Sequence, residues 1–111
     1  KKLLQTIHRM IRHSVIFSLH HPKNSEEERR FLAAAKTLSE IPGVKNFETL
    51  RQVSAKNNFD YGLSMEFNNA QEHAAYSNHR DHVAFINNYW VNEVKDFLEI
   101  DYEPLYFPHV D

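Results

Sequence analysis

The run Phe59-Asp60-Tyr61-Gly62-Leu63-Ser64-Met65-Glu66-Phe67 alternates large apolar side chains with small or polar ones. Successive side chains of a β-strand point to opposite faces, so this alternation places every large apolar residue on the same face. The pattern predicts a strand over residues 59–67, in a sheet with one buried face. A second layer of structure must cover that face.

A strand and a helix are predicted upstream of this run. In Ile11–His20 the larger apolar residues again alternate, and Pro22 follows as a strand breaker. Ser25 and Glu28 have the spacing of a capping box, so we expect a helix to begin near Ser25. Its apolar face consists of Phe31, Leu32, Ala35 and Leu38. Ile41-Pro42-Gly43 ends the helix, because proline disfavours its continuation and glycine permits a tight turn.

Another strand candidate, Val44–Val53, precedes the run and has two partly polar faces. Downstream, Asn68 or Asn69 is suited to cap a helix that continues towards Tyr76, and a second helical stretch begins near Asp81. Apolar residues recur there at intervals of three and four, which is typical of a helix packed on a sheet. They are Val83, Ile86, Trp90, Val94 and Phe97.

A short strand over Leu98–Glu103 completes a βαββαβ order in which the second helix is broken. This order predicts an α+β fold, a ferredoxin-like protomer with an antiparallel sheet. The 111 residues suit one domain, which we assign to residues 10–111, with a short C-terminal tail and an N-terminal extension at residues 1–9. Leu3, Leu4 and Ile7 have helical spacing in that extension.

Composition excludes several classes of protein. The formal net charge is −2 and no basic cluster is present, which argues against a nucleic-acid partner. Cysteine is absent, which excludes disulfides, thiolate nucleophiles and Cys-based zinc sites and fits the reducing cytoplasm. The apolar runs are too short to span a bilayer, so no membrane partner is expected. We expect a cytoplasmic protein, with an export signal upstream of Lys1 left open.

Three side chains with acid–base chemistry, Tyr76, His79 and His82, follow one another at spacings of three. This spacing gathers side chains on one face of a helix. Imidazole titrates near neutrality and a phenol donates or accepts a hydrogen bond, so the segment is a candidate for proton-transfer chemistry. The sequence contains no cofactor-binding signature, and we expect no cofactor.

Six stretches of the chain resemble the stress-responsive α/β barrel (Dabb) domain family. They are Met10–Phe17, Ile41–Val44, Tyr61–Phe67, Tyr76, His79–Val83 and Asp101–Glu103. The family's helical motif usually reads His-Pro-x-His, and here Arg80 replaces the proline. The resemblance implies that the protomer pairs its sheet with a second copy to form a dimeric α/β barrel. A homodimer would also give the open face of the sheet the cover it needs.

The resemblance also implies a site. Plant polyketide cyclases of this family close an aromatic ring by an aldol reaction, with a histidine as base and a tyrosine nearby. By motif, His82 stands at the position of the base and Tyr76 at that of the assisting tyrosine. His13 stands at a further pocket histidine, and Asp101 at the carboxylate that orients the base.

The same resemblance implies a pocket between the helical layer and the sheet. Its expected apolar lining includes Phe85 and Trp90. Leu63 stands where the cyclases have a second pocket histidine, so the specific cyclase activity does not carry over directly. The expected ligand is a small hydrophobic or aromatic compound.

Structural interpretations of these residues stay open beside the catalytic one. His82 can form a hydrogen bond across the helix–strand junction, and Asp101 can pair with Arg12. Phe85 and Trp90 also suit a hydrophobic core. A metal site of His79 and His82 with Glu72 or His73 is a minor alternative, because the spacing is not that of an H-E-x-x-H motif.

Three functions therefore remain open. The first is a cofactor-independent enzyme that performs proton transfer or aldol- or lyase-type chemistry on a carbonyl or aromatic compound. The second is a non-catalytic, stress-associated homodimer. The third is a cofactor-free monooxygenase. Fold-level resemblance does not decide among them.

Overall fold

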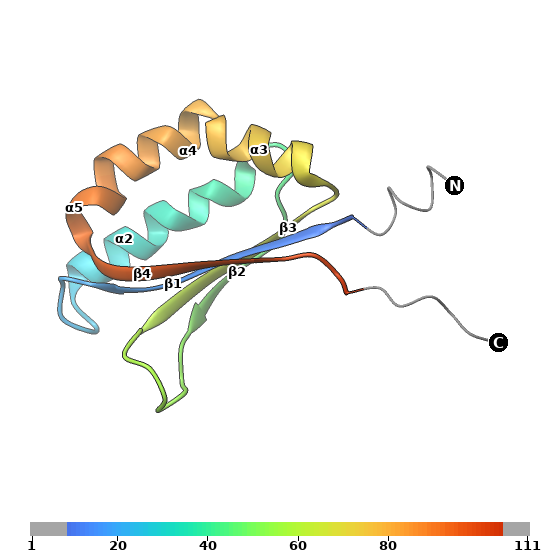
Figure 1. The fold of residues 1–111 in the computed structure, drawn as a ribbon. Helices are drawn as coiled ribbons and strands as arrows, with labels where there is room; N and C mark the ends of the chain where they lie inside the picture. Colours follow the sequence, from blue (N-terminus) through green and yellow to red (C-terminus); the bar gives the residue numbers. More distant parts are fainter. Residues whose placement is uncertain (1–8, 106–111) are drawn as a thin grey trace, which may run out of the picture.

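The computed structural model describes residues 9–105, a four-stranded sheet with helices on one face (Figure 1). The strands are β1 (Ile11–Leu19), β2 (Lys45–Arg51), β3 (Tyr61–Phe67) and β4 (Val94–Tyr102). Residues 1–8 of the predicted N-terminal extension and residues 106–111 of the tail lie outside the described residues.

The sheet has the strand order β2-β3-β1-β4, and every neighbouring pair is antiparallel. The predicted ferredoxin-like α+β protomer is confirmed. β1 is central, and its residue Val15 lies opposite Leu63 of β3 and Glu99 of β4. This register places Val15, Leu63 and Glu99 in one row that faces the helices.

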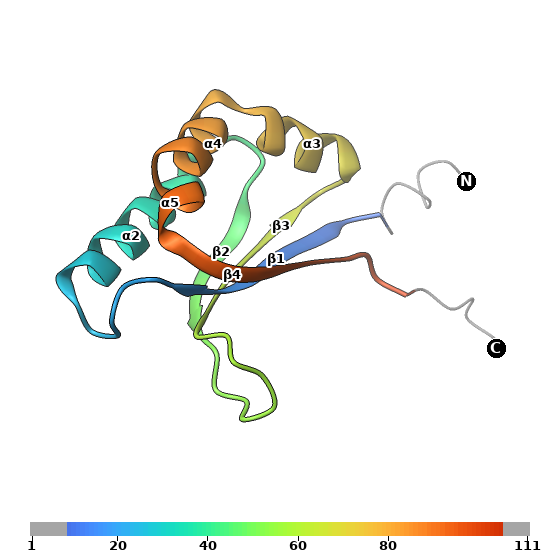
Figure 2. The same cartoon turned by 60° about the vertical axis from the view of Figure 1, so that its left-hand side comes forward.

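The helical layer consists of two segments. The first contains α2 (Glu26–Lys36) and the 3₁₀ turn η1 (Thr37–Glu40). The second contains α3 (Ala70–Asn78), α4 (Arg80–Phe85), the π turn η2 (Ile86–Trp90) and α5 (Val91–Glu93). Figures 1 and 2 show both segments on the same side of the sheet. Within residues 9–105 no helix combines the length and the apolar character needed to cross a membrane.

The predicted capping of the first helix is confirmed in one of its two hydrogen bonds. The Ser25 hydroxyl accepts from the Glu28 backbone N–H at 3.1 Å. The Glu28 carboxylate does not return to Ser25. It accepts from the Asn24 backbone N–H at 3.0 Å and from the Tyr61 hydroxyl, which ties α2 to β3 inside the core.

The expected end of the first helical segment is also confirmed. η1 ends at Glu40, directly before Ile41, and Gly43 adopts a φ of +92° in the turn that leads to β2. Glycine reaches this backbone conformation at low cost because it has no Cβ. The strand that follows is shorter than the predicted Val44–Val53, because its pairing with β3 ends at Arg51.

The prediction that Tyr76, His79 and His82 share one helical face is wrong. The backbone of His79 is extended, with φ −66° and ψ 140°, and separates α3 from α4. Its ring accepts a hydrogen bond from the Asp81 backbone N–H at 3.1 Å, so His79 is an N-cap. The side chain stabilises a new helix start instead of joining a functional cluster.

The predicted apolar face of the last helix is wrong at both ends. Val83 is exposed, and Val94 and Phe97 belong to β4. β4 begins four residues earlier than the predicted Leu98, because Val94 already pairs with Leu19 of β1. Pairing with β1 satisfies the backbone groups that a longer helix would otherwise have satisfied.

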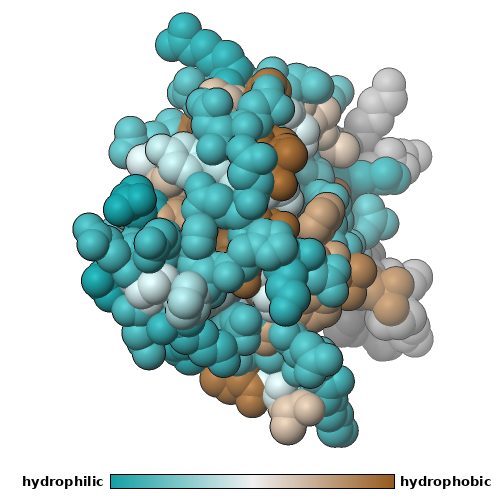
Figure 3. All heavy atoms as spheres, turned by 90° about the vertical axis from the view of Figure 1, so that its left-hand side faces the viewer, coloured by the Kyte–Doolittle hydropathy of each residue, from teal (hydrophilic) through white to brown (hydrophobic). Residues whose placement is uncertain are grey.

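The core lies between the sheet and the helices. The apolar face predicted for β3 is confirmed, since Tyr61, Leu63, Met65 and Phe67 are at most 4% exposed. They pack with Phe17, Phe31, Ala35, Leu38, Ile41, Tyr76 and Phe85. The end of the molecule at the left of Figure 1 is mostly hydrophilic, with small hydrophobic patches (Figure 3).

Candidate functional site

A cavity of about 250 Å³ lies between the sheet and the α3–η2 segment. Its lining is mostly apolar. The sheet contributes Val15, Leu63, Met65 and Phe97, and the helical layer contributes Leu38, Phe85, Ile86 and Trp90. The polar lining consists of His13, Tyr76, His82 and Glu99. The structure thus brings six of the seven predicted site residues to one cavity, and Asp101 is not part of the lining.

Tyr76 and His82 lie side by side although they belong to different helices. Their ring centroids are 4.6 Å apart, because the break at His79 redirects the chain between α3 and α4. Tyr76 is 2% exposed, and burial raises the pKa of its phenol well above the ordinary value. The phenol therefore stays protonated near neutral pH and is a hydrogen-bond donor.

The ring of His82 is oriented by a backbone carbonyl. Its Nδ1 lies 3.0 Å from the Ser77 carbonyl oxygen, so Nδ1–H donates and Nε2 carries the lone pair in the neutral ring. Burial lowers the pKa of His82 below its ordinary value, which favours this neutral form. A neutral imidazole with a free Nε2 is suited to accept a proton.

Asp101 lies elsewhere than the sequence predicted. It is directly opposite His13 across the β1–β4 pair, and its Oδ1 is 2.5 Å from His13 Nδ1. The prediction that Asp101 orients His82 is therefore wrong, because the strand register assigns this carboxylate to His13. The alternative pairing with Arg12 is also wrong, since Arg12 contacts Glu66 at 2.7 Å.

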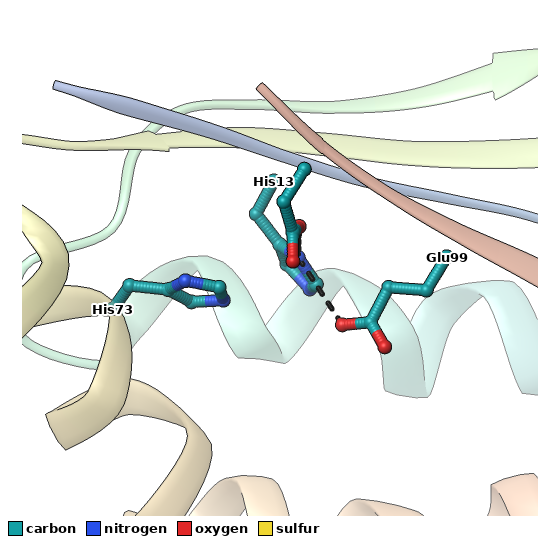
Figure 4. A group of neighbouring side chains, drawn as sticks. His13, His73 and Glu99 are labelled. Atoms are coloured by element: carbon teal, nitrogen blue, oxygen red, sulfur yellow. Dashed lines mark hydrogen bonds and ion pairs between the residues drawn. The ribbon is translucent and has the colours of Figure 1, made fainter. Parts of the chain in front are cut away.

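Two further polar residues reach His13. Glu99 was not predicted for any site, and His73 was considered only as a ligand of the minor metal alternative. Glu99 Oε2 lies 3.5 Å from His13 Nδ1, and the His73 ring centroid is 4.7 Å from that of His13 (Figure 4). Burial lowers the pKa of His73, and the nearby His13 acts in the same direction. Both residues had a sequence signal: Glu99 shares a strand face with Asp101, and His73 precedes Tyr76 by one helical turn.

The metal set considered from sequence does not form. His79 caps α4, and the Glu72 carboxylate accepts from the Asn68 backbone N–H at 3.1 Å. Among the described residues, the ligand-type side chains that do converge are His13, His73, Glu99 and Asp101, whose candidate ligand atoms all lie within 4.8 Å of one another.

Comparison with known families matches residues 11–104 to the stress-responsive A/B barrel domain, Dabb. The chain belongs to this family. The match spans all four strands and both helical segments of the Dabb chain. No curated protein matches its sequence.

Solved structures include a similar Dabb family protein with a ferredoxin-like fold from Mesorhizobium loti. It is 53% identical, with a TM-score of 0.86, and the match covers 87% of the present chain and 98% of the other. A hydroxynitrile lyase from Passiflora edulis has a TM-score of 0.78 at 13% identity, covering 91% and 99% of the two chains. A dimeric ferredoxin-like protein of unknown function from Thermobifida fusca has a TM-score of 0.70 at 21% identity, covering 86% and 91%. The last two likenesses concern the fold alone.

Proposed function

We propose that this Dabb-domain protein is an enzyme that transfers a proton to or from a small carbonyl or aromatic compound, in an aldol- or lyase-type reaction. The observation that carries the proposal is the pairing of His82 and Tyr76 at one cavity wall, with ring centroids 4.6 Å apart. His82 supplies the base, and Tyr76 supplies the hydrogen-bond donor.

His82 acts as the general base. Its Nε2 takes a proton from the carbon next to a substrate carbonyl, and the electron pair of the broken C–H bond moves to the carbonyl oxygen as an enolate. The Ser77 carbonyl holds Nδ1–H during this step and stabilises the imidazolium that forms. This carbonyl takes the role that the sequence assigned to Asp101.

Tyr76 acts as the donor to the enolate oxygen. Tyr76 lines the cavity, so its side chain is within reach of a ligand bound there. A donor that is already positioned and shielded from water stabilises developing negative charge more strongly than solvent does. This step uses only the side chains of His82 and Tyr76 and the backbone carbonyl of Ser77.

The cavity limits the substrate to small molecules. Its volume of about 250 Å³ is slightly below the range of about 300–1,000 Å³ that is typical of ligand pockets. The lining is mostly apolar, and the rings of Phe85 and Trp90 are 6.3 Å apart. A substrate with one aromatic ring and one carbonyl or hydroxyl group fits this lining best. The lyase alternative has a parallel in the fold of the Passiflora edulis hydroxynitrile lyase.

Two probe reactions test the proposal. Phenylacetone in D₂O reports proton abstraction through the loss of its α-proton signals by ¹H NMR, and mandelonitrile reports lyase cleavage through the ultraviolet absorbance of benzaldehyde. We expect the wild type to accelerate at least one of them. His82→Ala should lower the protein-dependent rate by roughly 10²-fold or more, the contribution typical of a general base. Tyr76→Phe should lower it by about 10²-fold.

His20→Gln is the matched control, because it also removes a histidine but from the exposed turn that follows β1. Its rate should equal that of the wild type. A His82→Ala variant that folds and retains the wild-type rate would show that His82 is not the base. Saturable binding of phenylacetone without turnover of either probe would favour the non-catalytic alternative.

The protein also acts as a homodimer in this proposal. The sheet face opposite the helices carries an apolar row across all four strands: Leu50, Gly62, Ile16 and Leu98. Leu50 and Leu98 are 45% and 50% exposed in the single chain. Exposed apolar side chains are more stable when another surface buries them. A second copy of the same sheet supplies a complementary surface. The dimeric Thermobifida fusca protein with this fold supports the same assembly.

A further inference from the structure

Four side chains with metal-binding groups converge beside the cavity from three different elements. His13 comes from β1, His73 from α3, and Glu99 and Asp101 from β4. One ligand-type atom of each lies within 4.8 Å of the corresponding atom of every other. Figure 4 shows His73 and Glu99 directed at His13 from opposite sides.

The two imidazoles are held in place by packing. His13 is 7% exposed, and the His73 ring stacks on Phe67 at 5.1 Å with an interplanar angle of 20°. The Phe67 ring also lies 6.5 Å from that of His13. Fixed ring orientation lowers the entropy cost of binding an ion, as supporting contacts do in known metal sites.

The two carboxylates lie on the more accessible side. The side chains of Glu99 and Asp101 are 54% and 39% exposed. An ion in solution can therefore reach both carboxylates. In a tetrahedral site with ligands about 2.0–2.2 Å from the metal, neighbouring ligand atoms lie roughly 3.4 Å apart. The 3.5 Å separation of His13 Nδ1 and Glu99 Oε2 matches this value. The 2.5 Å contact of His13 with Asp101 is a hydrogen bond that opens when an ion binds.

An ordinary cross-strand pair accounts for only part of this arrangement. The register explains why Asp101 meets His13, but it does not require Glu99 to approach the same nitrogen. It also does not require a second imidazole, from the helical layer, at 4.7 Å. All four groups are accounted for together if they share one cation.

The donor set selects the kind of ion. Two imidazole nitrogens suit first-row transition metals, whereas Mg²⁺ and Ca²⁺ prefer oxygen ligands alone. Two carboxylates supply two negative charges, which balance a divalent ion. We propose that His13, His73, Glu99 and Asp101 form a binding site for a divalent transition-metal ion at the edge of the cavity. His13 and Glu99 also line the cavity, so the ion would be accessible from it.

The site is tested with Zn²⁺ and Co²⁺ as probes. Untagged full-length protein is stripped with EDTA, dialysed and titrated with Zn²⁺ by isothermal titration calorimetry. Binding of Co²⁺ is followed by its visible absorption spectrum, which reports coordination geometry. We expect about one ion per chain, micromolar or tighter affinity, and a Co²⁺ spectrum indicating nitrogen and oxygen ligands.

Three variants assign the binding to these residues. His73→Gln should weaken Zn²⁺ binding by about 100-fold, and Glu99→Gln should weaken it by at least about tenfold. His20→Gln, which removes an exposed histidine elsewhere, should bind like the wild type. Circular dichroism checks that each variant is folded, and the half-exposed Glu99 provides the decisive variant if His73→Gln does not fold.

The absence of stoichiometric binding would overturn the proposal, as would equal affinities of the wild type and the folded Glu99→Gln variant. The inference is independent of the proposed acid–base reaction. Metal binding is measured without substrate, and the phenylacetone and mandelonitrile reactions are measured in the presence of EDTA. Failure of one proposal is therefore distinguishable from failure of the other.

Discussion

The Nδ1 atom of His82 lies 3.0 Å from the carbonyl oxygen of Ser77, five residues earlier in the chain. This contact crosses the break between α3 and α4 and fixes which ring nitrogen carries the proton. The other ring nitrogen, Nε2, then carries no proton and is available to a ligand in the cavity that His82 lines. We predict that His82 is the Nδ1–H tautomer at neutral pH, with a pKa below that of an unperturbed histidine.

Two-dimensional ¹H–¹⁵N NMR of the imidazole rings measures both properties, because the ¹⁵N shifts distinguish the tautomers and their pH dependence gives the pKa. His82→Gln assigns the resonance. An Nε2–H tautomer, or a His82 pKa above about 6.5, would contradict the proposed role of this side chain as a neutral base.

A related prediction concerns stability between pH 7.5 and 5.5. Burial lowers the folded-state pKa of both His82 and His73. In this pH range the unfolded chain takes up protons at these two positions before the folded chain does. Stability should therefore fall as pH decreases below about 6.5 and should continue to fall until the folded-state pKa values are passed. Each histidine adds at most about 1.4 kcal/mol per pH unit to the slope.

Urea unfolding at several pH values, with EDTA present, gives that slope. His82→Gln should reduce it, and the double variant with His73→Gln should reduce it further. An unchanged slope in the double variant would show that other groups cause the pH dependence.

Local patterns in the sequence sufficed for most of the fold. The alternation in Tyr61–Phe67 identifies the buried face of β3, and Ser25 identifies the start of α2. The end of the last helix was misplaced for a physical reason. Val94 and Phe97 continue a helical period, but backbone pairing with β1 outweighs that period once the sheet has formed.

The candidate site was predictable only where residues are close in sequence or share a family motif. The pairing of Asp101 with His13 depends on the register between two strands 88 residues apart. A shift of that register by one residue would turn Asp101 to the other face of the sheet. The role of the Ser77 carbonyl depends on the break at His79, because the chain must turn there before His82 can reach it.

The buried pair of Glu28 and Tyr61 gives a prediction about the core. The Tyr61 hydroxyl donates to the Glu28 carboxylate, and this hydrogen bond is the main cause of the lowered pKa of Glu28. Tyr61→Phe removes the donor and leaves a carboxylate that is 5% exposed with one partner fewer. We expect a loss of about 2 kcal/mol in the free energy of unfolding at pH 7.

The sign of the pH dependence follows from the direction of the shift. A carboxylate with a lowered folded-state pKa stabilises the protein above its unfolded-state pKa, and this stabilisation is lost as pH falls through the folded-state pKa. The difference between the wild type and Tyr61→Phe in urea unfolding should therefore be steady above pH 4.5, the ordinary pKa of a glutamate, and should shrink as pH falls below that value. A constant difference would mean that packing, rather than the charged hydrogen bond, accounts for the loss.

The open face of the sheet gives the prediction that tests assembly. Leu98 lies in the apolar row of that face, opposite Ile16, and is 50% exposed in the single chain. Leu98→Glu introduces a charge that a sheet-to-sheet contact would have to desolvate at two symmetry-related positions. We expect the wild type to be a dimer and this variant a monomer at micromolar concentration, as measured by size-exclusion chromatography with light scattering.

Val91→Glu is the matched control, because Val91 is 65% exposed but lies on α5, in the helical layer. It should remain a dimer. A dimeric Leu98→Glu variant with an intact circular dichroism spectrum would place the subunit interface on another surface.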